Sequence, residues 1–493
     1  MGAFKNDPET HVTETLCQWI ASLQIADIPP AVRERARYLI LDGIGCGLVG
    51  ARAPWSEVAT QAVAGFEPEG YSRVIGQEKR YGPLAAALLN GAYIQAMELD
   101  DYHSRAPLHS ASVVLPSLFA AAEVQARAHK ASPGTVDAVT GQQFLLSAIV
   151  GFETGPRAGL GVYGGDLLTR GWHSGPIFGC PASAAAASKL FSLPAPEIES
   201  AIGIACTQAG GLMSAQYEGM VKRMQHAFGA RNGLLGALLA RSGYGGIKKV
   251  FDRPYGGYLA MFSQGNGMTP PYLLDEVVDQ LGTLWHTEII RFKLYACVGG
   301  CHGQIEVLQR MQERYPERFA SEKLRDIGAI KVYLSEPIFK HDGWKPERPL
   351  TATGAQMSAA YIGATQLVDR QVLTAQFEDV MLDRDEVWEL ANKTTCYHSA
   401  EFDKPHHGCG ARIVITFADG FEIEDVTPYP KGFNPPLDNS DILDKFHKLA
   451  RSVLPEDRVV QIEQAVLRME ELENVEALLE ALVPTTKASN GHS

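Results

Sequence analysis

The N-terminal half of this chain constrains its fold most strongly, because one helical pattern follows another from about residue 11 to residue 265. Apolar residues recur there at spacings of three and four, which is typical of α-helices. Many of the segments are apolar nearly all round, as helices are inside a large bundle. The expected helices are 13–23, one that starts at the proline pair 29–30, 55–66, 84–99, 112–129, 142–156, 182–191, 196–213 and 227–242. Only residues 72–76 suggest a strand, so the pattern predicts a large all-helical domain.

The pattern changes after residue 265. Residues 268–271 contain two prolines and are a candidate linker, and alternating apolar residues at 330–334 then indicate a strand. A hairpin is expected at Asp419 and Gly420, because an Asp-Gly pair between two strand patterns favours a tight turn. Helical patterns lie between these strands, at 304–314, 355–369 and 386–393. This part is therefore expected to be a small α+β unit.

Helical patterns return after a proline-rich stretch, at 442–454, 456–472 and 475–482. We therefore expect a mainly α protein whose large helical domain is built from both chain ends and carries a smaller α+β domain as an insertion. The expected boundaries are 1–268 and 436–493 for the helical domain and 269–435 for the insertion. The last residues, 485–493, are expected to form a frayed tail.

The composition excludes several classes of protein. A formal net charge of −13 argues against a nucleic-acid-binding surface, and an anionic ligand would require a locally basic pocket. Uncharged segments such as 201–217 are interrupted by polar residues, which favours buried helices over membrane spans. The eight cysteines are scattered, as reduced thiols are. The N-terminus has no signal or transit pattern, so we expect a cytosolic enzyme, with a mitochondrial location left open.

A cluster of ionisable residues lies at the junction of two expected buried helices. It consists of Glu98, Asp100, Asp101, His103 and His109. Burying an unpaired carboxylate is costly, so these residues are expected to be paired or functional. Helix caps and solvated loop residues are the alternative interpretation, since Asp and His are common at helix ends. Because five such residues occur together, we favour a functional site.

Two further segments carry candidate site residues in the helical part. His173 lies in a glycine-flanked turn ahead of a helix expected near residue 182, where free backbone N–H groups could hold an anion. Capping or packing is the alternative interpretation of His173. Lys222 and Arg223 precede the apolar helix expected at 227–242, and they are candidates for binding carboxylates in an otherwise acidic chain.

The α+β unit opens with another polar segment. Lys293 and His302 are candidates for groups that reach across a cleft between the two domains. Cys297 and Cys301 have a spacing that resembles half of a zinc site, but the second pair of ligands is missing, so we expect no metal. Residues 406–407, two histidines, are expected in a surface loop. The chain has no GxGxxG motif after an expected strand, and no Walker, GxSxG or HExxH motif, so nucleotide-binding and serine-hydrolase interpretations have no local support.

Taken together, these segments resemble the MmgE/PrpD family along nearly the whole chain, and most closely its cis-aconitate-decarboxylating members from fungi. The strings that carry the resemblance are YLILDGIGCGLVGARAPWSE, ELDDYHSRAPLHSASVVLP, GWHSGPIFG, ACTQAGGLMSAQYEGMVKRMQHAFGARNGLL and FKLYACVGGCHG. The resemblance implies that the α+β insertion is a lid, that the protein is a homodimer, and that it converts the tricarboxylate cis-aconitate to itaconate without a metal or organic cofactor.

The resemblance also implies which residues form the site. The family's active-site positions fall on Glu98, Asp101, His109, His173, Lys222 and Lys293. We expect His109 or His173 to donate a proton and Asp101 or Glu98 to orient a histidine. The expected substrate-binding residues are Lys222, Arg223, Lys293, Tyr102, His103 and His302. Many relatives have a histidine where this chain has Gln225, followed here by His226, so the roles of Tyr102, His103 and His226 stay open.

Two other functions remain as alternatives. One is a dehydratase of the same family acting on 2-methylcitrate or a similar compound, which would use the same residues with a base as well as an acid. The other is a non-catalytic metal-binding protein with Asp100, Asp101, His103 and His109 as ligands.

Overall fold

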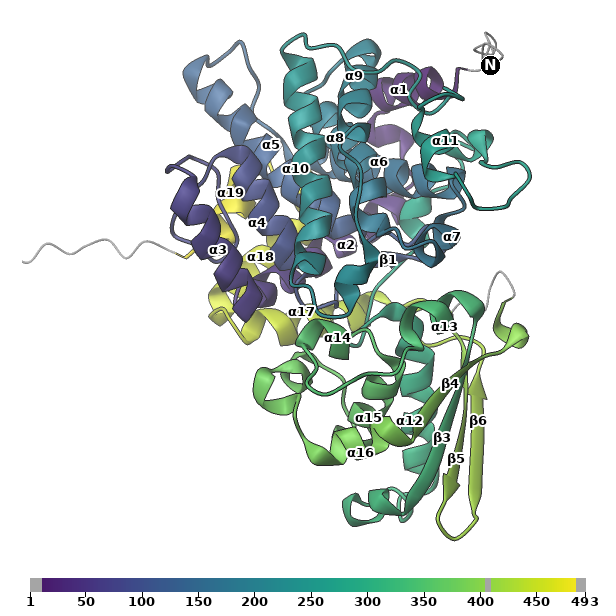
Figure 1. The fold of residues 1–493 in the computed structure, drawn as a ribbon. Helices are drawn as coiled ribbons and strands as arrows, with labels where there is room; N and C mark the ends of the chain where they lie inside the picture. The colour runs from purple at the N-terminus through teal and green to yellow at the C-terminus, as the bar shows by residue number, and fades with distance from the viewer. Residues whose placement is uncertain (1–10, 404–408, 485–493) are drawn as a thin grey trace, which may run out of the picture.

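The computed structural model describes residues 11–403 and 409–484. The protein is mainly α-helical with two small sheets, and the predominance of helix is as the sequence predicts (Figure 1). The smaller sheet pairs β1 Tyr102–His103 with β2 Ile290–Arg291. The predicted surface loop with His406 and His407 and the predicted tail at 485–493 lie outside the described residues. In the described part of the chain, no helix is long and apolar enough to cross a membrane.

The helical body is organised around α8, whose residues Ser174–Leu190 are all buried. Helices α5, α6, α9 and α10 pack around it. Gly233 of α10 allows a close approach, because a Cβ at this position would lie 2.2 Å from Oγ of Ser183 in α8. The first eleven helices are α1 Val12–Ser22, α2 Pro30–Gly50, α3 Pro54–Phe66, α4 Pro83–Gln95, α5 Ser110–Ala131, α6 Gly141–Gly161, α7 Gly164–Thr169, α8 Ser174–Leu190, α9 Ala195–Cys206, α10 Val221–Arg241 and α11 Tyr258–Phe262.

The C-terminal helices return to this body, where Figure 1 shows them in yellow beside the purple N-terminal helices. These helices are α17 Asn439–Arg451, α18 Glu456–Leu467 and α19 Glu476–Ala481. Helices α17 and α18 pack on α2, and Lys445 of α17 forms a buried ion pair with Asp42 of α2 at 2.7 Å. The two ends of the chain thus share one helical core.

The α+β unit contains a four-stranded sheet in the order β4-β3-β5-β6. Its strands are β3 Ile327–Leu334, β4 Thr394–His398, β5 Ala411–Phe417 and β6 Glu422–Thr427. The predicted alternation is confirmed, since Ile330, Val332 and Leu334 are buried, and β5 and β6 form the predicted hairpin with Gly420 at φ 84°. The helices of this unit are α12 His302–Arg314, α13 Glu336–Asp342, α14 Ala352–Ala355, α15 Ala359–Asp369 and α16 Asp385–Lys393.

Several predicted boundaries were wrong. Helix α8 begins at Ser174 instead of near residue 182, because Pro176 fits its first turn and Pro181 is accommodated inside the buried helix. Helix α10 begins at Val221 instead of residue 227, since the buried charges of Lys222 and Arg223 broke the apolar pattern without breaking the helix. The suggested strand at 72–76 is only a single bridge between Ser72 and Tyr81.

Candidate active site

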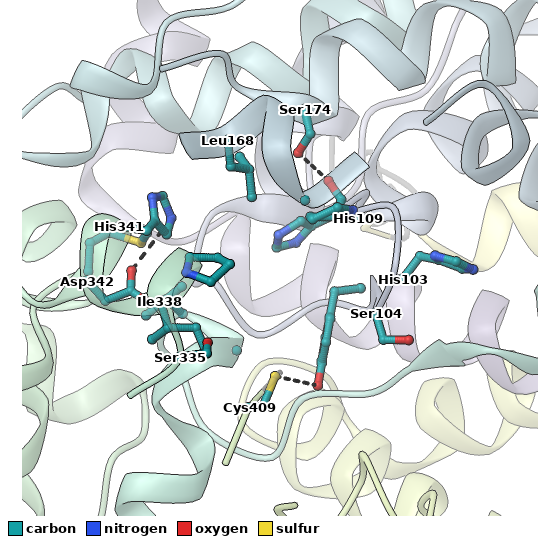
Figure 2. Close-up of a pocket in the computed structure, with 18 of the residues that line it drawn as sticks. His103, Ser104, His109, Leu168, Ser174, Ser335, Ile338, His341, Asp342 and Cys409 are labelled. Carbon is teal, nitrogen blue, oxygen red and sulfur yellow. Dashed lines mark hydrogen bonds and ion pairs between the residues drawn. The ribbon is translucent and has the colours of Figure 1, made fainter. Parts of the chain in front are cut away.

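A cavity of about 400 Å³ lies between the helical body and the α+β unit. Its walls come from the loop between α4 and α5, the first turns of α8 and α10, residues 293–300, and α13. Figure 2 shows His109 on one side of this cavity and the α13 side chains Ile338, His341 and Asp342 on the other. Segments far apart in the sequence therefore meet at one site.

The loop between α4 and α5 is held rigidly at its ends. Glu98 has the left-handed φ of 53°, a conformation that is strained for a residue with a large side chain. The carboxylate of Asp101 accepts hydrogen bonds from the backbone N–H groups of Ser110 and Ala111, at 2.7 and 2.8 Å, and so caps α5. Lys445 of α17 donates to the carbonyl of Leu99 at 2.7 Å. Helices from both chain ends thus fix the loop.

Glu98 is the centre of a buried charge cluster. Its carboxylate accepts hydrogen bonds from Nζ of Lys222 at 2.8 Å, from Nζ of Lys293 at 3.1 Å and from the guanidinium of Arg223. Burial alone would raise the pKa of Glu98, but the three cations outweigh it and hold that pKa well below its usual range. The cluster carries three positive side chains and one carboxylate, so it attracts further anions.

The three cations of this cluster differ in their access to the cavity. Lys222 and Lys293 line it, whereas Arg223 lies behind Glu98 and also donates to Oε1 of Gln356. The Gln356 amide donates in turn to the carbonyls of Met97 and Ala296, at 3.0 and 2.8 Å, which ties the α+β unit to the loop. Burial lowers the pKa of Lys222 to about 8, although Glu98 opposes this shift. Arg223, predicted to bind substrate, is therefore placed to support Glu98 instead.

His109 lines the cavity and is oriented by an acidic residue. Its Nδ1 lies 2.8 Å from Oδ1 of Asp100, and its Nε2 lies 3.7 Å from Oε1 of Glu98. The sequence prediction assigned the orienting carboxylate to Asp101 or Glu98. In the structure Asp100 makes the hydrogen bond, because both oxygens of Asp101 are occupied by the helix cap. Burial, with the nearby Asp100 charge, raises the pKa of Asp101 to about 8.

Three imidazole rings stand in a row at this wall, where His109 and His173 line the cavity and His226 lies between them. The ring of His226 lies 4.8 Å from the rings of both His109 and His173, edge to face. Nδ1 of His173 donates to Oε1 of Gln225 at 3.0 Å, since the amide nitrogen of Gln225 is used on the carbonyl of Leu212. Burial, and secondarily Lys222, lowers the pKa of His173 well below its usual range. A neutral His173 therefore presents Nε2 as an acceptor.

Of the other residues predicted to bind substrate, two line the cavity and one does not. Tyr102 and His103 line the cavity. Nδ1 of His103 accepts from the backbone N–H of Ala106 at 3.0 Å, and its Nε2 lies 3.2 Å from Nδ1 of His286. His302 was predicted to bind substrate, but it is buried away from the cavity wall, with its ring 5.0 Å from that of Tyr295.

The donors of the metal-binding alternative do not converge. Among residues 11–403 and 409–484, no three His, Cys, Asp or Glu side chains are grouped to hold a metal ion. Asp101 is directed at the backbone of α5, Asp100 at His109, and His103 at His286.

Sequence reasoning missed the contribution of α13. His341 and Asp342 line the cavity, with Nε2 of His341 3.6 Å from Oδ1 of Asp342. Burial lowers the pKa of His341 to about 4, and burial raises the pKa of Asp342 well above its usual range. Neither residue belongs to a motif or to one of the ionisable clusters recognised in the sequence, so the sequence carried no signal for these residues.

Comparison with known proteins identifies a family and several relatives. The chain matches the MmgE/PrpD N-terminal domain over residues 14–269 and the MmgE/PrpD C-terminal domain over residues 295–471. It is 62% identical over 473 residues to the cis-aconitate decarboxylase-like protein oryM of Aspergillus oryzae, which covers 96% of this chain and 97% of that protein. It is 52% identical over 481 residues to a cis-aconitate decarboxylase of Aspergillus terreus, covering 97% of both chains. A 2-methylcitrate dehydratase of Cupriavidus necator is 23% identical over 419 residues, or 81% of each chain.

Proposed function

We propose that this chain, which belongs to the MmgE/PrpD family, decarboxylates cis-aconitate to itaconate and carbon dioxide. The observation that carries the proposal is the surplus of buried positive charge around Glu98, beside a cavity that His109 also lines. The relatives at 62% and 52% identity are a cis-aconitate decarboxylase-like protein and a cis-aconitate decarboxylase, whereas the dehydratase is 23% identical. Decarboxylation is therefore favoured over dehydration.

The reaction can proceed without a metal or organic cofactor. The double bond of cis-aconitate makes the leaving carboxylate vinylogous to another carboxylate, so the electrons of the broken C–C bond can delocalise to the far carbon. An enzyme must bind the carboxylates, stabilise the developing dienolate and deliver one proton to that carbon. Cations and a histidine can do all three.

We assign the binding of the substrate carboxylates to Lys222 and Lys293, which both line the cavity although they are far apart in the sequence. Glu98 keeps both ammonium groups together, and Arg223 adds charge from behind. Closure of the α+β unit as a lid would exclude water and strengthen these interactions.

We assign proton delivery to His109 instead of His173. Asp100 holds Nδ1 of His109 at 2.8 Å, which leaves Nε2 as the nitrogen that can transfer a proton. His173 is not the donor we favour, because burial lowers its pKa well below the usual range and its Nε2 therefore carries no proton at neutral pH. A well-placed general acid contributes about 10²- to 10⁴-fold to a rate.

We further propose that the protein acts as a cytosolic homodimer, with residues 269–435 as the lid domain. The support is the resemblance to the family and the insertion of the sheet-containing region between helices that share one core. Light scattering on the purified protein tests the dimer.

The decisive experiment is incubation of the purified protein with cis-aconitate and, separately, with 2-methylcitrate. We expect equal amounts of itaconate and carbon dioxide from the first substrate, at a rate unchanged by a chelator. Loss of water from 2-methylcitrate without carbon dioxide from cis-aconitate would replace this proposal with the dehydratase.

A further inference from the structure

We propose that Asp342 is a specificity-determining residue, which binds the substrate as a neutral carboxylic acid by donating its O–H to one substrate carboxylate. This inference rests on the proposed function, because it takes a polycarboxylate as the ligand. Asp342 lines the cavity at the end of α13 and is fully buried. Neither of its side-chain oxygens has a hydrogen-bond partner in the part of the chain that the structure describes. An unpaired carboxyl group aimed into a ligand cavity is rare unless a ligand completes it.

The surroundings of Asp342 favour the neutral acid. Its ion-pair neighbour is His341, whose Nε2 lies 3.6 Å from Oδ1, beyond hydrogen-bond distance. On the other side the carboxyl group packs on the backbone of Gly300, where a Cβ would lie 2.8 Å from Oδ2. The other titratable groups that act on it are Lys222, Lys293, Glu98 and the thiols of Cys297, Cys301, Cys396 and Cys409. Burial outweighs the two lysines, so the pKa of Asp342 lies well above its usual range.

The charge balance of the cluster around Glu98 favours the same protonation state. The cluster contains three cations, Lys222, Arg223 and Lys293, and one carboxylate, so it has a surplus of two positive charges. An ionised Asp342 would reduce this surplus to one and would repel a substrate with three carboxylates. The incoming anion also favours protonation of Asp342, because like charges raise the pKa of a carboxyl group. A neutral Asp342 can instead donate to a carboxylate, and such charge-assisted hydrogen bonds are short and strong.

The position of Asp342 in the cavity determines how this hydrogen bond would contribute to substrate selection. His109 belongs to the wall formed by the helical body, whereas Asp342 belongs to α13 on the opposite side of the cavity (Figure 2). Lys222 and Lys293 also line the cavity. A substrate that is held by the lysines and extends toward α13 would meet a further donor there. A dicarboxylate that occupies only the lysine side would lose this interaction, so Asp342 would select for the additional carboxylate.

Two substitutions separate donation of a hydrogen bond from other roles. Asp342→Asn keeps an N–H donor of nearly the same shape, and Asp342→Leu removes the donor. We expect KM for cis-aconitate to stay within about threefold of wild type in the Asn variant and to rise about 10- to 100-fold in the Leu variant, the usual range for losing a hydrogen bond to a charged group. The exposed Asp385→Asn in α16 is the matched control and should change neither KM nor kcat.

The pH dependence gives a second readout. KM of the wild type should rise where Asp342 ionises, and the Asn variant should lack this rise. Lys222, with a pKa of about 8, contributes an alkaline limb in both proteins, so the comparison between them isolates Asp342. His341 titrates at about 4 and does not contribute in this range. Because Asp342 makes no hydrogen bond in the described chain, neither variant should lower the melting temperature, as loss of a structural carboxyl group would.

The possible results are distinct. An unchanged KM in a folded Asp342→Leu variant would overturn the role of Asp342 in binding. An Asp342→Asn variant with normal KM and strongly reduced kcat would also overturn it, because Asp342 would then be a proton donor. If the Leu variant does not fold, an unaltered pH profile in the Asn variant also overturns the inference. Calorimetric measurement of cis-aconitate binding to the wild type and both variants distinguishes failure of the decarboxylase proposal from failure of the Asp342 proposal. The wild type could bind cis-aconitate without converting it, while the Asp342→Leu variant loses this affinity and the Asp342→Asn variant keeps it. That result would refute the proposed decarboxylase activity and support the role of Asp342 in binding.

Discussion

Oδ1 of Asp100 lies 2.8 Å from Nδ1 of His109, and both residues belong to the loop that joins α4 to α5. This pair resembles other carboxylate–histidine pairs in which the acid fixes the tautomer and direction of the ring. We expect His109→Gln to lower kcat by about 10²- to 10⁴-fold, as loss of a general acid does. Steady-state rates of itaconate formation, with circular dichroism to verify folding, measure this effect.

Asp100→Asn should lower kcat by at least about tenfold with little change in KM, because the ring of His109 loses its orienting partner. If the two residues act as one unit, the double variant should be no slower than His109→Gln alone. Rate losses that simply multiply would show that Asp100 and His109 act independently.

Glu98→Gln should destabilise the protein strongly. The substitution leaves Lys222, Arg223 and Lys293 buried without their carboxylate, and breaking a buried ion pair in this way costs about 3–5 kcal/mol. Urea unfolding at pH 7 measures the change. Because the pKa of Glu98 is held well below its usual range, its stabilising contribution is present above the unfolded-state pKa and is lost as pH falls through the lower, folded-state value. The variant should therefore lose less stability on acidification than the wild type, and parallel pH curves would contradict this account.

Local pattern predicted much of the fold, because most elements follow simple periodicities. Strand β3 was predictable from three alternating apolar residues, and the β5–β6 hairpin from Asp419 and Gly420. Strand β4 was missed, because its parallel partner β3 lies some 60 residues earlier and its sequence, TTCYH, has no clear alternation. The predicted domain boundaries at 268 and 435 stay predictions.

The site was predictable as a set of residues and not as a set of contacts. Lys222 and Lys293 are separated from Glu98 by 124 and 195 positions, and only the tertiary fold brings them to one carboxylate. The choice between Asp100 and Asp101 depended on which of the two caps α5, which adjacent acidic residues cannot reveal. The catalytic and binding roles assigned here stay predictions until the variants are measured.

Gly175→Ala should disturb the row of imidazoles. A Cβ at Gly175 would lie 2.0 Å from Nε2 of His226, so the ring of His226 must move and press on His109 and His173. We expect a loss of about 1–3 kcal/mol of unfolding free energy, typical of overpacking a core, together with reduced kcat. Gly210→Ala is the matched control, because a Cβ there meets nothing within 4 Å. Equal melting temperatures for the two variants would contradict the close packing of His226.

The pH dependence of kcat/KM should show the loss of the positive charge of Lys222. Burial lowers the pKa of Lys222 to about 8, so kcat/KM for cis-aconitate should fall as pH rises through this value and the ammonium group loses its charge. Unfolding does not explain this loss, because the unfolded chain, with the ordinary value of 10.5, binds more protons than the folded chain between pH 8 and 10.5. The contribution of Lys222 to the free energy of unfolding therefore rises with pH across that range. Lys222→Arg keeps the positive charge at all these pH values and should move the alkaline limb upward. A limb that stays at pH 8 in the Arg variant would assign it to another group.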